Sequence, residues 1–242
     1  MCENEDIQEI YRRVLADLNR LENVEYKKKV VRFFKTGKGE YAEEDHFLGL
    51  RVPQIRRVAK KYSSIPLDSI SLLLSSIWHE SRFCALCILI DQFNKASESM
   101  RRVLFQFYMS HIKWVNNWDL VDLSAPAIVG VYLLDKDKSI LLQLAKGTNL
   151  WEQRIAIVST LTFIRAGLLK YTITLAKIYL EHTHDLIHKA TGWMLREIGK
   201  KDRSVLLLFL DKYAFQMPRT MLRYSIEHLS KEERTDYLTR VE

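Results

Sequence analysis

The sequence predicts an all-α fold, and three observations lead to that prediction. Apolar residues recur at three- and four-residue spacing along most of the chain, as the buried face of a helix requires. Only 8 glycines and 4 prolines occur in 242 residues, which is few for a β protein with many tight turns. Four tryptophans recur at intervals of about 36 to 42 residues, close to the period of helical-hairpin repeats.

The expected helices follow one another with short connections. The first rests on the apolar face between Ile7 and Leu18. Asn117 precedes a later helix as an N-cap and Asp185 opens another, while Gly147 and Gly167 mark the ends of two more. The expected helices span residues 4–20, 24–36, 53–62, 67–76, 79–94, 97–112, 118–133, 137–146, 150–165, 169–181 and 184–200, with others from 202 onward.

A weak internal repeat underlies this helical pattern. Trp78, Trp114, Trp151 and Trp193 each lie near a short turn between helices. Helical hairpins with a period of about 40 residues are typical of HEAT-type solenoids, whose stacked pairs form a concave surface suited to a rod-like ligand. Segment 37–46 is expected to be a loop inside the fold, so the prediction is a single domain over residues 1–242.

Charge indicates the class of partner. The chain has 48% apolar residues, which supports a sizeable core, and a formal net charge of +7. Basic residues concentrate between residues 27 and 61 and again between 196 and 203, a pattern that suits a polyanion such as nucleic acid. The alternative interpretation is that these runs are simply solvated helix faces.

Redox, metal and membrane functions are not favoured. The odd cysteine count, Cys2, Cys84 and Cys87, indicates a reducing compartment, and the last two suit core packing better than metal binding. The apolar run 127–134 is too short to cross a bilayer, and residues 1–13 lack the apolar stretch of a secretory signal. We therefore expect a soluble cytoplasmic protein without a metal or cofactor; the histidine cluster lacks the acidic or cysteine partners of a metal site (His182, His184, His188).

The candidate functional residues are two tryptophans, one acid and one arginine. Trp118 and Asp122 are four residues apart, so they are neighbours on one helix face. Taken singly, Trp193 is a normal core residue, Asp122 suits a cap or salt bridge, and Arg154 suits an ion pair. Together they lie in successive predicted hairpins, where equivalent positions line the same concave face.

At these residues the sequence resembles the DNA alkylation repair family, the AlkD-type HEAT-like DNA glycosylases. The resemblance runs from about residue 32 to 201 and rests on four anchors in the same order. They are RFFKTGKGEYAEEDHFLGLRVPQIRR (32–57), NNWDLVDLSAP (116–126), NLWEQRIAI (149–157) and KATGWMLREIGK (189–200).

The resemblance implies a right-handed superhelical solenoid that holds alkylated double-stranded DNA in a basic groove. It also implies a hydrolase that removes N3- and N7-alkylated purines. Because a solenoid needs no partner and one-step hydrolysis is the simpler reaction, we expect a monofunctional monomer that associates with the nucleoid when it acts on DNA; a lysine nucleophile that also cleaves the strand is the alternative. Carried over by position, Asp122 matches the catalytic carboxylate, and Trp118 and Trp193 match tryptophans of the cleft. Arg154 matches the arginine beside the lesion phosphate, and Phe33 lies at the position of another DNA contact. The basic runs add further candidate DNA contacts, which are Arg51, Arg56, Arg57, Arg196, Lys200 and Lys201. Phe33 departs from the family pattern, which has a tyrosine hydroxyl there.

The expected chemistry needs one acid. A purine alkylated at N3 or N7 carries a positive charge and leaves as a neutral base, so no general acid is required, unlike ordinary glycoside hydrolysis. Asp122 would stabilise the positive charge on the deoxyribose and orient water. No sequence pattern indicates a pocket for a flipped base. The alternatives are a non-catalytic damage sensor or a HEAT-type scaffold for protein or nucleic acid.

Overall fold

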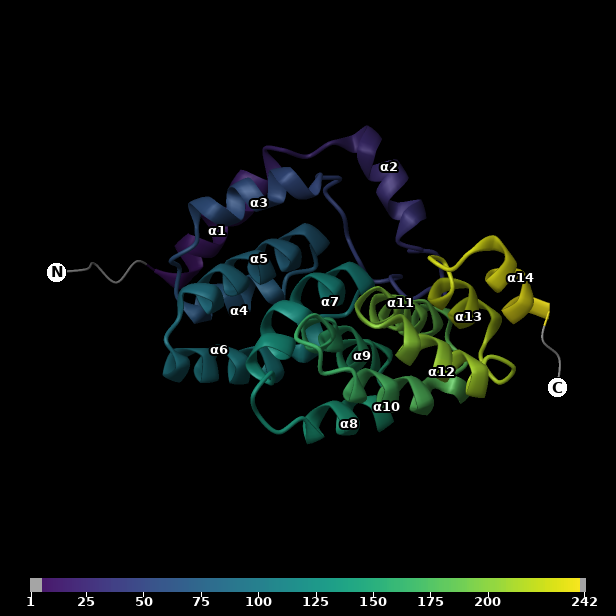
Figure 1. The fold of residues 1–242 in the computed structure, drawn as a ribbon. Helices are drawn as coiled ribbons and strands as arrows, with labels where there is room; N and C mark the ends of the chain where they lie inside the picture. The colour runs from purple at the N-terminus through teal and green to yellow at the C-terminus, as the bar shows by residue number, and fades with distance from the viewer. Residues whose placement is uncertain (1–5, 240–242) are drawn as a thin grey trace. The chain divides into compact units, whose positions relative to one another are not determined.

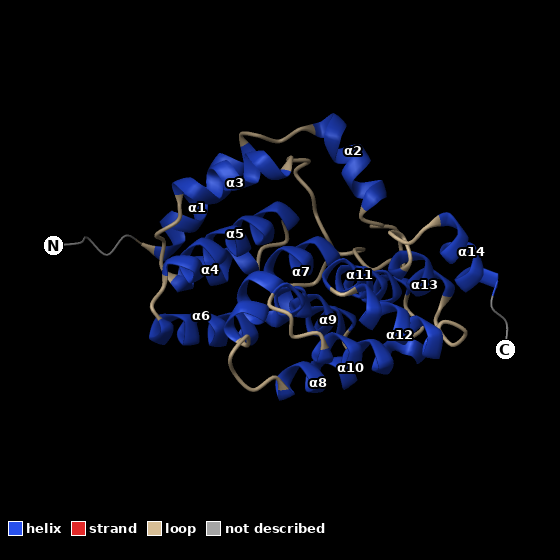
Figure 2. Ribbon diagram, viewed as in Figure 1, coloured by secondary structure: helices blue, strands red, loops and turns tan. Residues whose placement is uncertain are grey.

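The computed structural model describes residues 6–239, and these residues form helices and loops without a β-strand (Figures 1 and 2). The all-α prediction is therefore confirmed. The chain divides into two compact units, Met1–Leu120 and Val121–Glu242. The expectation of a single domain stays a prediction.

The first unit is organised around helix α5. Helices α3, α4 and α6 pack against α5, and α1 packs against α3, α4 and α5. Nearly every residue of α5 from His79 to Leu89 is buried, as expected for a helix that is covered on all sides. The helices of this unit are α1 (Ile7–Asn19), α2 (Val24–Phe33), α3 (Val52–Lys61), α4 (Leu67–Leu74), α5 (His79–Lys95), α6 (Glu98–Ser110) and the 3-10 helix η1 (Ile112–Trp114).

The second unit stacks helices in chain order around α9 and α11. Helices α8, α10 and α11 pack against α9, while α12 and α13 pack against α11. This order of neighbours is that of stacked helical hairpins, as the sequence repeat predicts. The helices are α8 (Ser139–Lys146), α9 (Leu150–Arg165), α10 (Lys170–Ile178), η3 (Tyr179–Glu181), α11 (Asp185–Lys201), α12 (Arg203–Tyr213), α13 (Arg219–Ser225) and α14 (Lys231–Thr239). Helix α7 (Trp118–Ser124) contains the boundary between the units.

The expected helix over residues 118–133 is interrupted. Helix α7 ends at Ser124 and a π-helical turn, η2, spans Ala125–Gly130. Pro126 explains this change because it has no backbone N–H for the regular helical bond. The turn packs closely on α9, since a Cβ on Gly130 would lie 2.4 Å from the carbonyl oxygen of Ser159.

Other boundaries differ from the expected ones at the helix ends. The helices expected over 97–112 and 169–181 finish earlier and are followed by the 3-10 turns η1 and η3. Helix α11 begins at Asp185, as expected, and the residue before it, His184, is the N-cap, because its ring nitrogen accepts the backbone N–H of Leu186. Segment 37–46 lies outside the α-helices, as expected, with Gly39 at a φ of +78°. Residues 4 and 5 of the first expected helix lie outside the described residues.

The two cysteines of α5 contribute to helix packing. Cys84 is buried and Cys87 is half-buried, and both are free thiols. Burial raises the pKa of Cys84 well above its usual range and that of Cys87 to about 11, which disfavours the reactive thiolate. Core packing is therefore confirmed for this pair, while Cys2 lies outside the described residues.

Candidate functional site

Helix α7 presents two of the predicted site residues. Asn117 precedes the helix, and its side-chain oxygen accepts the backbone N–H of Trp118 at 2.8 Å, so the predicted cap is confirmed. Trp118 opens the helix and Asp122 follows one turn later, both half-buried. The local sequence thus fixes an indole and a carboxylate on neighbouring turns of one short helix.

The carboxylate of Asp122 is held by Arg154. Arg154 donates from Nε to Oδ1 at 2.9 Å and from Nη2 to Oδ2 at 2.8 Å, which is a bidentate ion pair within the second unit. Its Nη1 donates to the carbonyl oxygen of Leu186 at 2.5 Å. The Arg154 side chain is only 6% exposed, against 21% for Asp122. Arg154 therefore orients Asp122, while its expected bond to a DNA phosphate stays a prediction.

Trp193 lies on α11 and is half-buried. Its neighbour Gly192 faces α13, because a Cβ there would lie 2.5 Å from the carbonyl oxygen of Met221. This close approach fixes how α11 packs and hence which way its next residues face. A role for Trp193 at the DNA sugar stays a prediction.

The predicted DNA-binding cations differ in their surroundings. Arg51 lies over the ring of Tyr26, with 5.3 Å from the guanidinium carbon to the ring centroid. Arg196 pairs with Glu197 and Glu227, and Lys200 with Glu197. Arg51 and Lys200 are exposed as well as paired, and three further cations are exposed and suited to solvent or phosphate (Arg56, Arg57, Lys201).

Replacing Arg56 and Arg57 together by alanine is expected to weaken binding of duplex DNA and flatten its salt dependence. Each phosphate that is no longer neutralised lowers the slope of log affinity against log salt by about 0.9. Fluorescence anisotropy at several salt concentrations measures this. The matched control is a double alanine variant of Lys95 and Lys136, which already pair with carboxylates. An equal effect in both variants would show a response to net charge and not to specific binding of DNA by these arginines.

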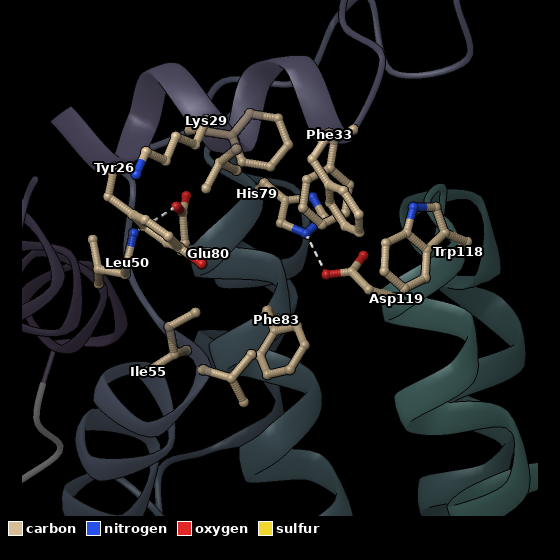
Figure 3. A pocket seen from close by; sticks show the side chains of 14 residues that line it. Tyr26, Lys29, Phe33, Leu50, Ile55, His79, Glu80, Phe83, Trp118 and Asp119 are labelled. Carbon is tan, nitrogen blue, oxygen red and sulfur yellow. Dashed lines mark hydrogen bonds and ion pairs between the residues drawn. The ribbon is translucent and has the colours of Figure 1, made fainter. Parts of the chain in front are cut away.

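The first unit contains a pocket with aromatic walls and a volume of about 580 Å³. Helices α2, α3, α5 and α7 contribute to it (Figure 3). Its polar lining residues are Lys29, His79, Glu80 and Asp119. Its aromatic lining residues are Tyr26, Phe33, Phe34, Phe47, Phe83 and Trp118.

Trp118 is part of this aromatic wall. Its ring stacks on Phe34, with centroids 5.2 Å apart and planes 14° apart, and contacts the edge of Phe33 at 5.6 Å. Phe33 is 66% exposed, so a large apolar side chain stands at the open side of the pocket. Trp118 and Phe33, predicted separately from the sequence, are thus brought together in the first unit.

A buried charged network supports the pocket. His79 donates from Nε2 to Asp119 at 2.8 Å, which Figure 3 shows, and its Nδ1 lies 3.4 Å from Asp45. Asp45 also accepts from Arg82 at 2.5 Å and from Asn117 at 2.8 Å. The residues at its centre are almost fully buried, so each charge depends on its partners.

Glu80 holds the loop that precedes α3. Its carboxylate accepts backbone N–H bonds from Leu48 at 2.9 Å, Gly49 at 2.8 Å and Leu50 at 3.2 Å. Gly49 has a φ of +80° and approaches α2 so closely that a Cβ would lie 2.4 Å from the carbonyl oxygen of Asn23. The loop wall of the pocket is therefore fixed by one buried acid and one glycine.

The stability of the first unit is expected to fall as pH rises from about 6.5 to 9. Burial opposes charge on His79, but the charge and hydrogen bond of Asp119, with the bond to Asp45, raise its pKa from 6.5 to about 9. Between pH 6.5 and 9 the folded state binds more protons at His79 than the unfolded chain does. The contribution of His79 to stability is therefore complete below pH 6.5 and is lost as the pH rises to about 9. Urea unfolding at both pH values measures the change, on the order of 3 kcal/mol. His79→Gln should flatten the slope; an unchanged slope would remove His79 as its source.

Sequence reasoning missed this network. Asp45 lies in a segment expected to be a loop, and His79, Glu80 and Arg82 begin a helix expected from its apolar pattern. The available signal was three charged or titratable residues at the start of an otherwise apolar helix, since such groups are buried only with partners.

Metal and membrane features can be addressed for residues 6–239. No group of three or more metal-ligating side chains is found in this part of the chain. The predicted histidine cluster is hydrogen-bonded instead: His182 bonds Gln153 at 2.9 Å and accepts the backbone N–H of His184 at 3.0 Å. Within the same residues, no helix combines the length and apolarity needed to span a bilayer.

Comparison with known proteins identifies the class. Residues 14–229 match the family described as DNA alkylation repair enzyme. A solved structure from Enterococcus faecalis, named as a predicted DNA alkylation repair enzyme, has the same fold, with a TM-score of 0.67 and 16% identity. The similarity covers 87% of this chain and 97% of that one. No curated protein sequence matches this chain significantly.

The fold is thus an all-helical, helical-repeat fold that this chain shares with the Enterococcus faecalis protein. Because the family match spans most of its length, the chain belongs to the DNA alkylation repair enzyme family. This membership assigns it a role in DNA repair.

Proposed function

We propose that the protein is a monofunctional DNA-alkylpurine N-glycosylase. The observation that carries the proposal is the carboxylate of Asp122, held bidentately by Arg154 and four residues from Trp118 on α7. The substrate is double-stranded DNA containing N3- or N7-alkylated purines, and the protein acts as a monomer without a metal or cofactor. Family membership supports DNA as the substrate.

Asp122 acts on the sugar. Cleavage of the glycosidic bond moves positive charge onto the deoxyribose, and a fixed carboxylate stabilises that charge without reorganising during the reaction. The half-buried position limits competing water around the carboxylate. Asp122 also accepts a hydrogen bond from a water molecule and directs the water oxygen to C1′. The C1′–O bond forms as the C1′–N bond breaks, the alkylated base leaves as a neutral molecule, and the proton of the attacking water passes to solvent.

The other site residues bind the DNA or hold Asp122 in position. Trp118 and Trp193 offer π faces to the sugar as it gains charge, each worth roughly 0.5 to 2 kcal/mol. Arg154 holds both Asp122 oxygens, so it keeps the carboxylate in one orientation. The exposed cations bind phosphates and fix the register of the duplex (Arg51, Arg56, Arg57, Lys201).

The direct test is release of methylated bases. Purified protein is incubated with methylated duplex DNA, and free 3-methyladenine and 7-methylguanine are quantified by chromatography. We expect time-dependent release that exceeds spontaneous depurination, with the DNA strand left intact. Strand cleavage coupled to base loss would contradict the monofunctional assignment.

A non-catalytic damage sensor is the second candidate. One observation favours it: Arg154 compensates the charge of Asp122, which reduces the field available to a cationic sugar. A sensor binds methylated duplex more tightly than unmethylated duplex and releases no base. The two candidates therefore give opposite results in the release assay.

A further inference from the structure

Helix α7 is too short to fix its own orientation. It has seven residues and is followed by the π-helical turn η2, whereas an isolated helix is marginal in water below about 12 residues. Trp118 is its first residue and Asp122 lies one turn later, so the contacts of the first turn affect the direction of both side chains. Arg154 restrains Asp122 within the second unit, and the first turn needs a restraint of its own.

The residues on either side of Trp118 are both bonded to the buried network of the first unit. Before it, Asn117 accepts the backbone N–H of Trp118 and donates from Nδ2 to Asp45 at 2.8 Å. After it, Asp119 accepts a hydrogen bond from Nε2 of His79 at 2.8 Å (Figure 3). Because Nδ1 of His79 lies 3.4 Å from Asp45, the His79 ring joins the two attachments.

His79 can donate to both acids only as an imidazolium. A neutral imidazole has one N–H donor, so its other nitrogen would face a carboxylate with a lone pair. Three acids and two cations contact the ring or line the pocket beside it, and they come from a loop, α7, α2 and α5 itself (Asp45, Asp119, Glu80, Lys29, Arg82). Protonation of His79 therefore balances the charge of this set. Burial opposes the charge, but Asp119 and the bond to Asp45 raise the pKa of His79 to about 9.

The His79 ring also supports the indole of Trp118 from behind. Its centroid lies 4.7 Å from that of Phe47, on which it stacks, and 5.0 Å from that of Phe34. Phe34 in turn stacks on Trp118. His79 thus restrains the indole through the hydrogen bond to the next residue of α7 and through the rings that pack against it.

We propose that His79 is a positioning residue for base excision: as an imidazolium it holds the first turn of α7, with Trp118, in the orientation that the reaction needs. The proposal rests on the proposed function, because base excision is the process that this orientation serves. In this role His79 acts through Asp119 and does not contact the substrate. Loss of its proton places a lone pair against one carboxylate, and the first turn of α7 loses a restraint.

The test compares the wild type with His79→Gln across pH, since glutamine keeps an amide donor but carries no charge and does not titrate. At pH 6.5 we expect release of 3-methyladenine under single-turnover conditions to be about tenfold slower in the variant, with duplex affinity changed less than about twofold. The ratio of the two rates should fall towards one as the pH passes about 9. The substrate's own response to pH is common to both proteins, so the ratio isolates His79. A ratio that is constant with pH would overturn the proposal.

A cavity variant separates positioning from stability. Leu86 is fully buried on α5 and belongs neither to the charged network nor to the pocket lining. Leu86→Ala therefore destabilises the same helix without touching the contacts of α7. At a temperature at which circular dichroism shows both variants folded, its release rate should stay within about twofold of the wild type. An equal loss of rate in Leu86→Ala and His79→Gln would overturn the proposal.

Replacing Asp119 by asparagine removes the partner through which His79 acts. Asp119→Asn should slow release by about the same factor as His79→Gln, and the double variant should be no slower than either single variant. Losses that multiply in the double variant would overturn the proposal. The Asp119 side chain is 15% exposed against 4% for His79, so Asp119→Asn also gives the pH comparison if His79→Gln does not fold.

The indole of Trp118 gives a readout that does not depend on activity. In protein labelled with fluorotryptophan, the fluorine resonance missing from Trp118→Phe should shift with a midpoint near the pKa of His79, about 9, and should not shift in His79→Gln. The resonance of Trp151, on α9 of the second unit, is the control and should not move. The shift without release of bases from DNA would retain the hold of His79 on α7 and reject the glycosylase. Release without the shift would retain the glycosylase and reject the positioning role.

Discussion

Replacing Asp122 by asparagine is expected to lower alkylpurine release about a hundred- to a thousandfold, with DNA binding retained. Asparagine preserves the size of the side chain and one hydrogen bond from Arg154, but it removes the negative charge that stabilises the sugar. Release of 3-methyladenine under single-turnover conditions measures the chemical step, and anisotropy with the same duplex measures binding. Asp135→Asn is the matched control, because Asp135 has a side chain that is 78% exposed.

The ion pair between Asp122 and Arg154 affects the stability of the Asp122→Asn variant, and a double variant separates that effect from catalysis. Removing the charge of Asp122 leaves Arg154 buried without its counter-charge, which costs about 3 to 5 kcal/mol when a buried pair is broken. The double variant Asp122→Asn/Arg154→Gln removes both charges, so its stability should recover while its activity stays low. If the double variant excises at the wild-type rate, Asp122 is not catalytic. If both variants lose folding and DNA binding together, Asp122 has a structural role.

Replacing Asp45 by alanine is expected to lower the free energy of unfolding of the first unit by about 3 to 5 kcal/mol. Asp45 is buried and accepts bonds from Arg82, Asn117 and His79. Burial opposes its charge, but the His79 bond and the charge of Arg82 hold the pKa of Asp45 below its usual range. Alanine therefore leaves two buried cations without their shared acid. Urea unfolding followed by tryptophan fluorescence measures the decrease.

An exposed ion pair gives the matched comparison for Asp45. Asp91 pairs with Lys95 at 2.6 Å, but these side chains are 41% and 70% exposed. Asp91→Ala is expected to cost less than about 1 kcal/mol, because water solvates the remaining cation. Similar decreases for Asp45→Ala and Asp91→Ala would show that burial of the network contributes little.

Helix positions followed from local sequence to within a few residues in most of the described chain. Apolar spacing and helix caps act over one or two helical turns, so they can be recognised in the amino-acid sequence. The exception was the helix expected over 118–133, where the π-turn at Ala125–Gly130 interrupts the regular bonds. Pro126 was visible in the sequence, but whether it ends, bends or bulges a helix depends on what packs against it. In this protein α9 decides the outcome, through the close approach of Gly130 to Ser159.

The candidate site was predictable only in part. The spacing of Trp118 and Asp122 placed them on neighbouring turns of one helix, and the structure has them there. Pairing of Arg154 with an acid was among the alternatives, but the choice of Asp122 joins residues 32 positions apart. Nothing in the sequence selects that partner over Glu152, which is closer along the chain. Distances across helices come from packing, which a single sequence does not encode in any short pattern.

The sequence by itself determined the helical class, the family and the residue types available for chemistry. Periodicity and ordered motifs are properties of short segments, so they can be recognised in the sequence without a structure. Tertiary structure alone decided that Arg154 holds Asp122, and that residues from four segments enclose an aromatic pocket. It also decided that His79 stays charged in a buried position, because its two acids come from a loop and another helix. Burial and electrostatics depend on neighbours in space, and those neighbours are set by how the helices pack.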